Sequence, residues 1–134
     1  MHTASNADLW TGNAYLRDQR VTGWITPLAG NSHLVSARVQ GTSRFYAAGF
    51  HDGQVVITKE EHGTSVLAKA PFTPELGREY RIELRVIGQT LTLSVDGKEL
   101  LTANDASYRY GMGGLRIASA GRMSVGRLEI EDFA

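Results

Sequence analysis

The chain has 134 residues, with 14 basic and 14 acidic side chains, 15 glycines, three prolines and no cysteine. This length suits one domain with its own hydrophobic core, and the lack of cysteine excludes disulfides and thiolate metal sites. A formal charge of zero excludes a protein-wide attraction to nucleic acid or to an anionic membrane.

Short runs of alternating apolar and polar residues, separated by glycine turns, predict strands throughout and no helix. The first 13 residues are predicted as a tail or edge segment, and residues 14–134 as one domain. The start lacks a basic region and an apolar stretch, so a complete chain is expected to be cytoplasmic. The expected strands are 14–18, 20–26, 33–40, 43–50, 54–59, 65–69, 79–87, 90–95, 98–102, 114–118 and 122–131.

The clearest pattern is a hairpin in the second half of the chain. Apolar and charged side chains alternate in residues 79–87, and apolar side chains alternate with Ser and Thr in residues 90–95. A Gly-Gln turn at 88–89 separates the two strands, and an Asp-Gly turn at 96–97 ends the second. This pattern is typical of antiparallel strands with one buried and one exposed face.

The alternation also predicts the hydrophobic core. In the last strand the apolar positions change from odd to even across Gly126, which predicts a bulge or a sharp bend there. The expected core residues are Leu34, Val35, Val39, Phe50, Val55, Ile57, Leu67, Tyr80, Ile82, Leu84, Val86, Leu91, Leu93, Val95, Leu115, Ile117, Leu128 and Ile130.

A chain of about ten short strands without helices is compatible with two architectures, a sandwich or a barrel. The run Leu76–Arg81, an alternating hairpin ending in Val95–Lys98, and then Gly111–Ile117 together resemble the concanavalin A-like jelly roll, including laminin G-like and pentraxin-like modules. The resemblance covers roughly residues 72–131 and, more loosely, residues 20–60. It implies an all-β fold, a two-sheet antiparallel jelly-roll sandwich.

A narrower resemblance lies in residues 23–72. The motifs are Gly23-Trp24, Val39-Gln40-Gly41, Arg44, Tyr46–Phe50, Leu67-Ala68 and Pro71-Phe72. They look like accessory sandwich modules of bacterial hydrolases, for example modules beside ADP-ribosylglycohydrolase-like domains. This similarity implies a catalytic domain elsewhere in a parent protein.

Catalytic motifs are sparse. Glu129 and Glu131 share a strand face, but they lack the third acid of the E-x-D-x-x-E pattern of jelly-roll glucanases, so we interpret them as solvated carboxylates. His33, His51 and His62 are widely separated and do not suggest a metal site. No Gly-x-Ser-x-Gly elbow occurs. The chain is therefore expected to be neither an enzyme nor dependent on a cofactor.

Laminin G-like and pentraxin-like modules often bind calcium through loop oxygens, which makes Asp52, Asn104 and Asp105 candidates. Calcium takes six to eight oxygen ligands, and one or two acids per loop are few. The Asp-Gly turn also accounts for Asp52. No metal site is predicted.

A saccharide-binding face is the favoured functional hypothesis. Sugars stack on aromatic rings, while planar polar side chains bind their hydroxyls. The predicted ligand-binding residues are Trp24, Arg38, Gln40, Tyr46 and Arg116 on one sheet face, with Tyr108 and Tyr110 in a loop at its rim. In the opposing interpretation, Trp24 belongs to the core and the arginines pair with Glu83 or Glu129 across strands.

The sequence thus predicts a non-catalytic module that binds a saccharide or glycoconjugate and is accessory to a hydrolase. Two alternatives stay open. One is a structural or interaction domain that packs on a catalytic partner or on itself, and the other is a small glycoside hydrolase. Neither nucleic acid nor a membrane is an expected partner, because basic and acidic residues are interleaved and no apolar run reaches the length of a span.

Overall fold

The computed structural model describes residues 2–5, 8–11, 17–29, 32–41, 44–116 and 122–132. These residues form strands, turns and loops, and they include no helix long and apolar enough to cross a membrane. The strands are β1 (His2–Ser5), β2 (Asp8–Thr11), β3 (Gln19–Ala29), β4 (Ser32–Gly41), β5 (Arg44–His51), β6 (Gln54–Glu61), β7 (Thr64–Pro71), β8 (Tyr80–Ile87), β9 (Thr90–Val95), β10 (Lys98–Asn104), β11 (Met112–Arg116) and β12 (Arg122–Asp132).

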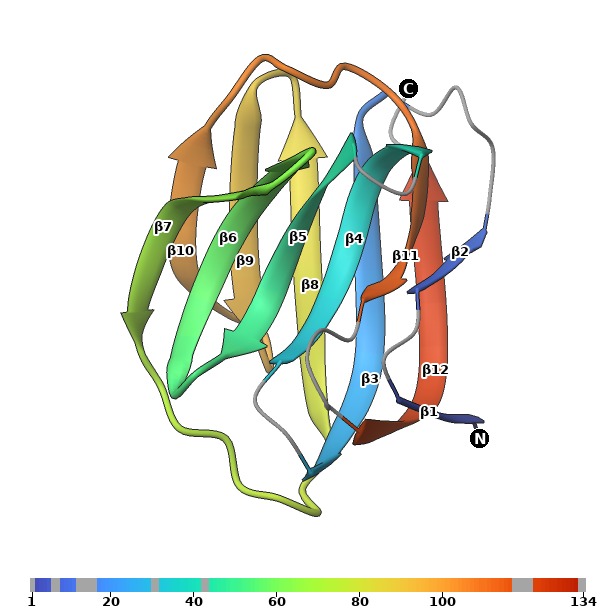
Figure 1. Ribbon diagram of the computed structural model, residues 1–134, viewed down its shortest axis with the longest axis vertical. Coiled ribbons are helices and arrows are strands. Elements are labelled where there is room, and N and C mark those ends of the chain that lie inside the picture. Colours follow the sequence, from blue (N-terminus) through green and yellow to red (C-terminus); the bar gives the residue numbers. More distant parts are fainter. Residues whose placement is uncertain are drawn as a thin grey trace.

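The strands form two sheets of six, stacked as a sandwich (Figure 1). Sheet A has the order β1-β12-β3-β8-β9-β10, and sheet B has the order β2-β11-β4-β5-β6-β7. The strand pairs are antiparallel in both sheets. The predicted all-β, two-sheet antiparallel sandwich is therefore confirmed.

Two short edge strands near the start lie in the segment predicted as a tail or edge segment, but they are not among the expected strands. β1 pairs with β12 at one edge of sheet A, and β2 pairs with β11 at one edge of sheet B. Each has four residues, too few for an alternating pattern to stand out. Of the strand expected at 14–18, residues 14–16 lie outside the part that the structure describes, and residues 17–18 precede β3.

The main core lies between the sheets and confirms most of the predicted set. In β8, buried and more exposed residues alternate as the hairpin pattern predicts. Leu67, Leu128 and Ile130 are partly buried against this core. Its buried members are Val21, Ile25, Val35, Ala37, Tyr46, Ala48, Phe50, Val55, Ile57, Tyr80, Ile82, Leu84, Val86, Leu91, Leu93, Val95, Ala103 and Tyr108. The side chains of the two remaining predicted residues, Leu115 and Ile117, lie outside the described part.

Leu34 and Val39 are buried, but in a second cluster with Phe45, Ala47 and Val56. Along β5, Phe45 and Ala47 alternate with side chains of the main core. Because successive side chains of a strand point to opposite faces, this cluster lies on the other side of sheet B. Sheet B therefore buries apolar side chains on both of its faces.

Two irregular strands shape the sandwich. The pairing of β12 with β3 shifts between Val125 and Arg127, which confirms the bulge predicted at Gly126. The pairing of β4 with β5 shifts between Ala37 and Gly41. Within that second irregularity Arg38 has a φ of 50°, a left-handed conformation that is uncommon for an arginine. The bulge of β4 contributes Arg38 to the site described next.

Candidate ligand-binding pocket

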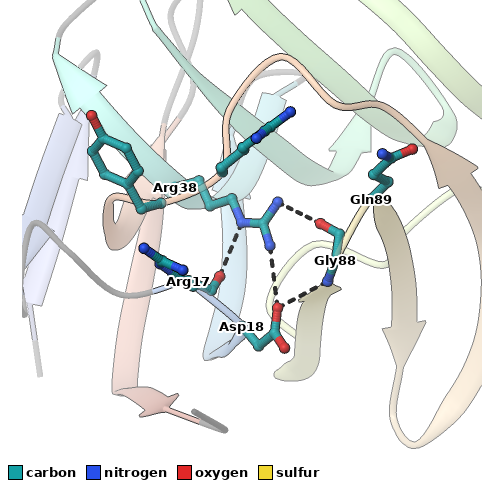
Figure 2. Close-up of a pocket in the computed structure, with 7 residues that line it drawn as sticks. Arg17, Asp18, Arg38, Gly88 and Gln89 are labelled. Atoms are coloured by element: carbon teal, nitrogen blue, oxygen red, sulfur yellow. Dashed lines mark hydrogen bonds and ion pairs between the residues drawn. The ribbon is translucent and has the colours of Figure 1, made fainter.

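A pocket with a volume of about 400 Å³ lies at one end of the sandwich (Figure 2). Four segments meet there: the residues before β3, the bulge of β4, the β8–β9 turn and the β10–β11 loop, residues 105–111. This loop runs across the end of the sandwich in Figure 1, and a backbone hydrogen bond of 2.9 Å from Asp105 N to Gln89 O ties it to the β8–β9 turn. The lining residues are Arg17, Asp18, Arg38, Gly88, Gln89, Arg109 and Tyr110.

Arg38 is the buried centre of the pocket, with a relative exposure of 2%. Its Nε donates to Arg17 O at 3.0 Å, and its Nη1 donates to Gly88 O at 2.7 Å and to Tyr108 O at 2.8 Å. Its Nη2 lies 3.4 Å from Asp18 Oδ1. One guanidinium thus joins the residues before β3, the β8–β9 turn and the β10–β11 loop. Figure 2 shows its bonds to Arg17, Asp18 and Gly88.

Arg38 remains positively charged although it is buried. Removal from water lowers the pKa of the guanidinium, and the negative charge of Asp18 counteracts this effect. An arginine in water titrates so far above neutrality that the buried side chain remains a cation. Four of its five N–H groups have the partners named above, and one Nη2–H has no partner among the described residues.

Asp18 faces Arg38 with one carboxylate oxygen engaged and the other open. Oδ1 accepts from Gly88 N at 2.9 Å and from Arg38 Nη2 (Figure 2). Oδ2 has no hydrogen-bond partner in the described structure, and the side chain is 38% exposed. The pocket therefore presents an acceptor oxygen next to a buried cationic donor.

The backbone behind the pocket is closely packed. Gln19 is fully buried; its Oε1 accepts from Arg38 N at 3.4 Å, and its Nε2 donates to Gly111 O at 3.0 Å. Gly111 has a φ of 149°, and a Cβ added there would lie 2.2 Å from the carbonyl carbon of Arg38. Only glycine lets the β10–β11 loop approach the bulge of β4 this closely.

A polar network fastens the same loop to sheet B. The Tyr46 hydroxyl donates to Asp105 Oδ1 at 2.6 Å and accepts from Tyr108 N at 3.1 Å. Lys59 Nζ donates to Asp105 Oδ2 at 3.2 Å, and the Tyr108 hydroxyl donates to Glu60 O. The rings of Tyr46 and Tyr108 pack edge to face, 5.1 Å between centroids. The loop is thereby held from β5 and β6.

The network also shifts two pKa values. Burial alone raises the pKa of Asp105, but hydrogen bonds from Tyr46, Ser107 and Lys59 outweigh it and lower that pKa to about 2. Burial, followed by the hydrogen bond to Asp105, raises the pKa of Tyr46 well above its ordinary value. At neutral pH the loop is therefore anchored by an ionised carboxylate and a neutral phenol.

The prediction that the ligand-binding residues share one sheet face is wrong. Trp24 belongs to β3 in sheet A, whereas Arg38, Gln40 and Tyr46 belong to sheet B. Arg116 lies in β11 of sheet B, and its side chain is outside the described part. Strand alternation locates a side chain on one of two faces but does not say which sheet the strand joins.

Two tyrosines predicted at the ligand surface are core residues instead. Tyr46 and Tyr108 have relative exposures of 0% and 3% and belong to the main cluster. Arg38 is also not outward on the sheet, because the bulge of β4 interrupts the alternation. Of the seven predicted residues, the pocket brings together Arg38 and Tyr110. Gln40 lies beside them, with its Nε2 donating to Tyr110 O at 3.1 Å.

Five lining residues were missed: Arg17, Asp18, Gly88, Gln89 and Arg109. The sequence did mark the Gly-Gln turn and the polar loop that contains Arg109 as irregular segments. No local signal indicates that these segments, 20 or more residues apart, meet at one end of the sandwich. The predicted turns were the signal that could have indicated the site, since loops carried by a rigid scaffold often hold binding sites.

Trp24 lies in a separate hollow of about 260 Å³ on the outer face of sheet A, with Glu83 and Glu129 also lining it. The Arg127 guanidinium lies over the indole ring, 5.2 Å from its centroid, and also pairs with Glu129. Arg20 bridges Glu83 at 3.4 Å and also pairs with Glu131. This face carries charge pairs within and between strands around one half-buried tryptophan.

Among the described side chains, no group of three or more His, Cys, Asp or Glu is arranged to hold a metal ion. The calcium candidates have partners within the protein. Asp52 lies 3.2 Å from His51, and Asn104 Oδ1 accepts from Thr90 at 3.1 Å. Asp105 belongs to the tyrosine network.

No protein-family model matches this sequence, and no curated protein does. Solved structures share the fold. The carbohydrate-binding module CBM66 from Bacillus subtilis is 17% identical, with a TM-score of 0.80 over 97% of this chain and 95% of that one. Sheep galectin-11 is 14% identical, with a TM-score of 0.68 over 97% and 96%. The alginate lyase AlgAT5 of polysaccharide lyase family 7 is 14% identical, with a TM-score of 0.62 over 86% of this chain and 59% of that one. These likenesses confirm the jelly-roll sandwich.

Proposed function

We propose that this protein is a non-catalytic saccharide-binding module and that the saccharide binds in the pocket between the β8–β9 turn and the β10–β11 loop. The observation that carries the proposal is the pairing of a buried Arg38 donor with the open Oδ2 of Asp18. Sugar hydroxyls both donate and accept, so a fixed donor beside a fixed acceptor suits them. Tyr110, 43% exposed, adds an aromatic surface at the pocket wall.

The size and construction of the pocket support the same proposal. Its volume of about 400 Å³ lies within the range of roughly 300–1,000 Å³ that small-ligand sites occupy. The buried guanidinium is fixed by backbone carbonyls, so little ordering is needed when a ligand binds. Two of the fold's solved neighbours are by name a carbohydrate-binding module and a galectin, in keeping with this proposal.

The lining residues favour a module that binds a saccharide without cleaving it. A retaining or inverting glycosidase uses two carboxyl groups on either side of the bond that breaks. Asp18 is the single carboxylate among the described lining residues, and it is bonded to Arg38 and Gly88. We propose further that the module serves a hydrolase as an accessory domain, in keeping with the resemblance of residues 23–72 to such modules.

The proposal is tested by screening the protein on a glycan array and titrating each hit by NMR. We expect a saccharide to move the backbone amide signals of Gly88, Gln89 and Arg109. Gln89→Trp places a bulky side chain at the exposed turn in the pocket wall and should weaken binding by at least about tenfold.

Lys98→Trp is the matched control. It adds the same ring at an exposed position next to the 96–97 turn, at the other end of the β8–β9 hairpin. This variant should bind as the wild type does. Absence of any saccharide hit would contradict the proposed function. Equal binding by both tryptophan variants would place the site elsewhere on the protein.

A further inference from the structure

The pocket carries an excess of positive charge that hydroxyl binding does not need. Among the described residues that line it, Arg17, Arg38 and Arg109 contribute three positive charges and Asp18 one negative charge, which leaves two positive charges. Arg38 and Asp18 form the ion pair, so the excess resides on the other two arginines.

Both of these arginines are exposed. Within the structure as described, the side chains of Arg17 and Arg109 form no hydrogen bond and no ion pair; only the Arg17 backbone carbonyl is engaged, by Arg38. By contrast, Arg78, near the other end of the hairpin, pairs with Asp96 at 3.2 Å. Two guanidiniums without carboxylate partners among the described lining residues favour a ligand that brings its own anionic group.

The Asp18 carboxylate in the same pocket restricts the chemical class of the ligand. Asp18 Oδ2 is open and repels a ligand that is anionic throughout, such as inorganic phosphate. It accepts readily from a hydroxyl, and the remaining Nη2–H of Arg38 donates to one. The pocket therefore matches a molecule with hydroxyls on one side and a carboxylate on another.

We infer that the pocket binds the terminal residue of an acidic saccharide, with its carboxylate held by Arg17 and Arg109 and its hydroxyls by Asp18 and Arg38. This inference rests on the proposed function and specifies its ligand class. A terminal residue fits because the pocket lies at the end of the sandwich, where the four segments named above line it, and not along a sheet face.

The probes are the methyl glycosides of glucuronic, galacturonic and mannuronic acid, each compared with its neutral hexoside by NMR titration. We expect at least one uronide to bind about tenfold more tightly than its neutral counterpart, as charge-assisted hydrogen bonds allow. Its affinity should fall when salt rises from about 0.05 M to about 0.5 M. Array hits should carry carboxylates.

Two variants separate charge from shape. Arg17→Gln and Arg109→Gln should each weaken uronide binding by about fivefold while leaving neutral hexosides unchanged. Arg78→Gln, whose arginine pairs with Asp96 away from the pocket, is the matched control and should change neither. Thermal melting of each variant checks that the fold is intact.

The outcomes distinguish this inference from the function on which it rests. Neutral sugars that bind at the pocket as tightly as uronides would overturn the acidic ligand and leave the saccharide-binding function standing. Inorganic phosphate that moves the same amides with equal affinity would reduce the pocket to a simple anion site, overturning the inference. An array without hits and titrations without shifts would overturn both.

Discussion

At the residue scale, the ionised carboxylate of Asp105 holds the β10–β11 loop in place. Asp105 accepts from the Tyr46 hydroxyl, from Ser107 N and from Lys59 Nζ, and through them it attaches the loop to β5 and β6. Its side chain is 14% exposed, so solvent screens these interactions only in part. The loop that supplies Arg109 and Tyr110 to the pocket is thus held by charge-assisted hydrogen bonds.

Stability should therefore depend on pH through Asp105. A pKa lowered to about 2 from about 3.8 stabilises the folded state by roughly 2 kcal/mol above the ordinary pKa. That contribution is lost as the pH falls from about 4 through about 2, because the carboxylate becomes protonated. In urea unfolding, Asp105→Asn should lower the free energy of unfolding by about 2 kcal/mol at pH 6 and by almost nothing at pH 2.

Glu75→Gln provides the matched comparison, since Glu75 is exposed and its side chain makes no hydrogen bond or ion pair in the described structure. It should leave the free energy of unfolding within about 0.5 kcal/mol of the wild type at both pH values. A constant difference between Asp105→Asn and the wild type from pH 6 to pH 2 would refute the role of the ionised carboxylate.

At the scale of elements, the bulge of β4 and the β10–β11 loop fit together through Gly111. The left-handed Arg38 turns its side chain out of the strand alternation, and Gly111 packs directly against its backbone. Gln19 bonds to both, from β3 of the opposite sheet. The pocket therefore arises from a contact between backbones, which pins Arg38 in place before any ligand binds.

Gly111→Ala should be strongly destabilising. The added Cβ would lie 2.2 Å from Arg38 C and 2.5 Å from Val39 N, and neither backbone atom can move without disturbing β4. We expect a loss of at least about 3 kcal/mol in urea unfolding. Gly77→Ala, at a φ of 82° with open space around the added Cβ, should cost only about 1–2 kcal/mol of conformational strain.

The comparison isolates the close approach, because both glycines have a positive φ and only Gly111 has a neighbour within 4 Å. If the two alanine variants lost similar free energies of unfolding, conformational strain alone would account for the effect of Gly111→Ala. The backbone contact between the loop and β4 would then contribute nothing.

At the scale of the whole molecule, the fold was predictable and the site largely was not. Strand alternation is local, so residues 79–101 alone identify antiparallel strands, and the bulge at Gly126 follows from the switch of parity. The pocket joins four segments that are distant in the sequence. Arg38 reaches it only because a bulge breaks the alternation that had assigned it to a sheet face.

A substitution at Trp24, on the outer face of sheet A, distinguishes binding in the pocket from binding at the sheet face expected from the sequence alone. Trp24 is six residues from Asp18, about 20 Å along an extended strand, and its indole lies on the outer face of sheet A under Arg127. Sites this far apart, with no shared partner, act independently to within roughly 0.5 kcal/mol.

Trp24→Ala should therefore leave saccharide affinity within about twofold of the wild type. It should lower the free energy of unfolding by about 2–3 kcal/mol, through the lost burial of the indole and the lost cation–π contact. Calorimetric titration with an array hit measures the first quantity and urea unfolding the second. A folded variant whose affinity drops tenfold or more would transfer the binding site to the outer face of sheet A, where the Arg127–Glu129 and Arg20–Glu83 pairs flank the indole.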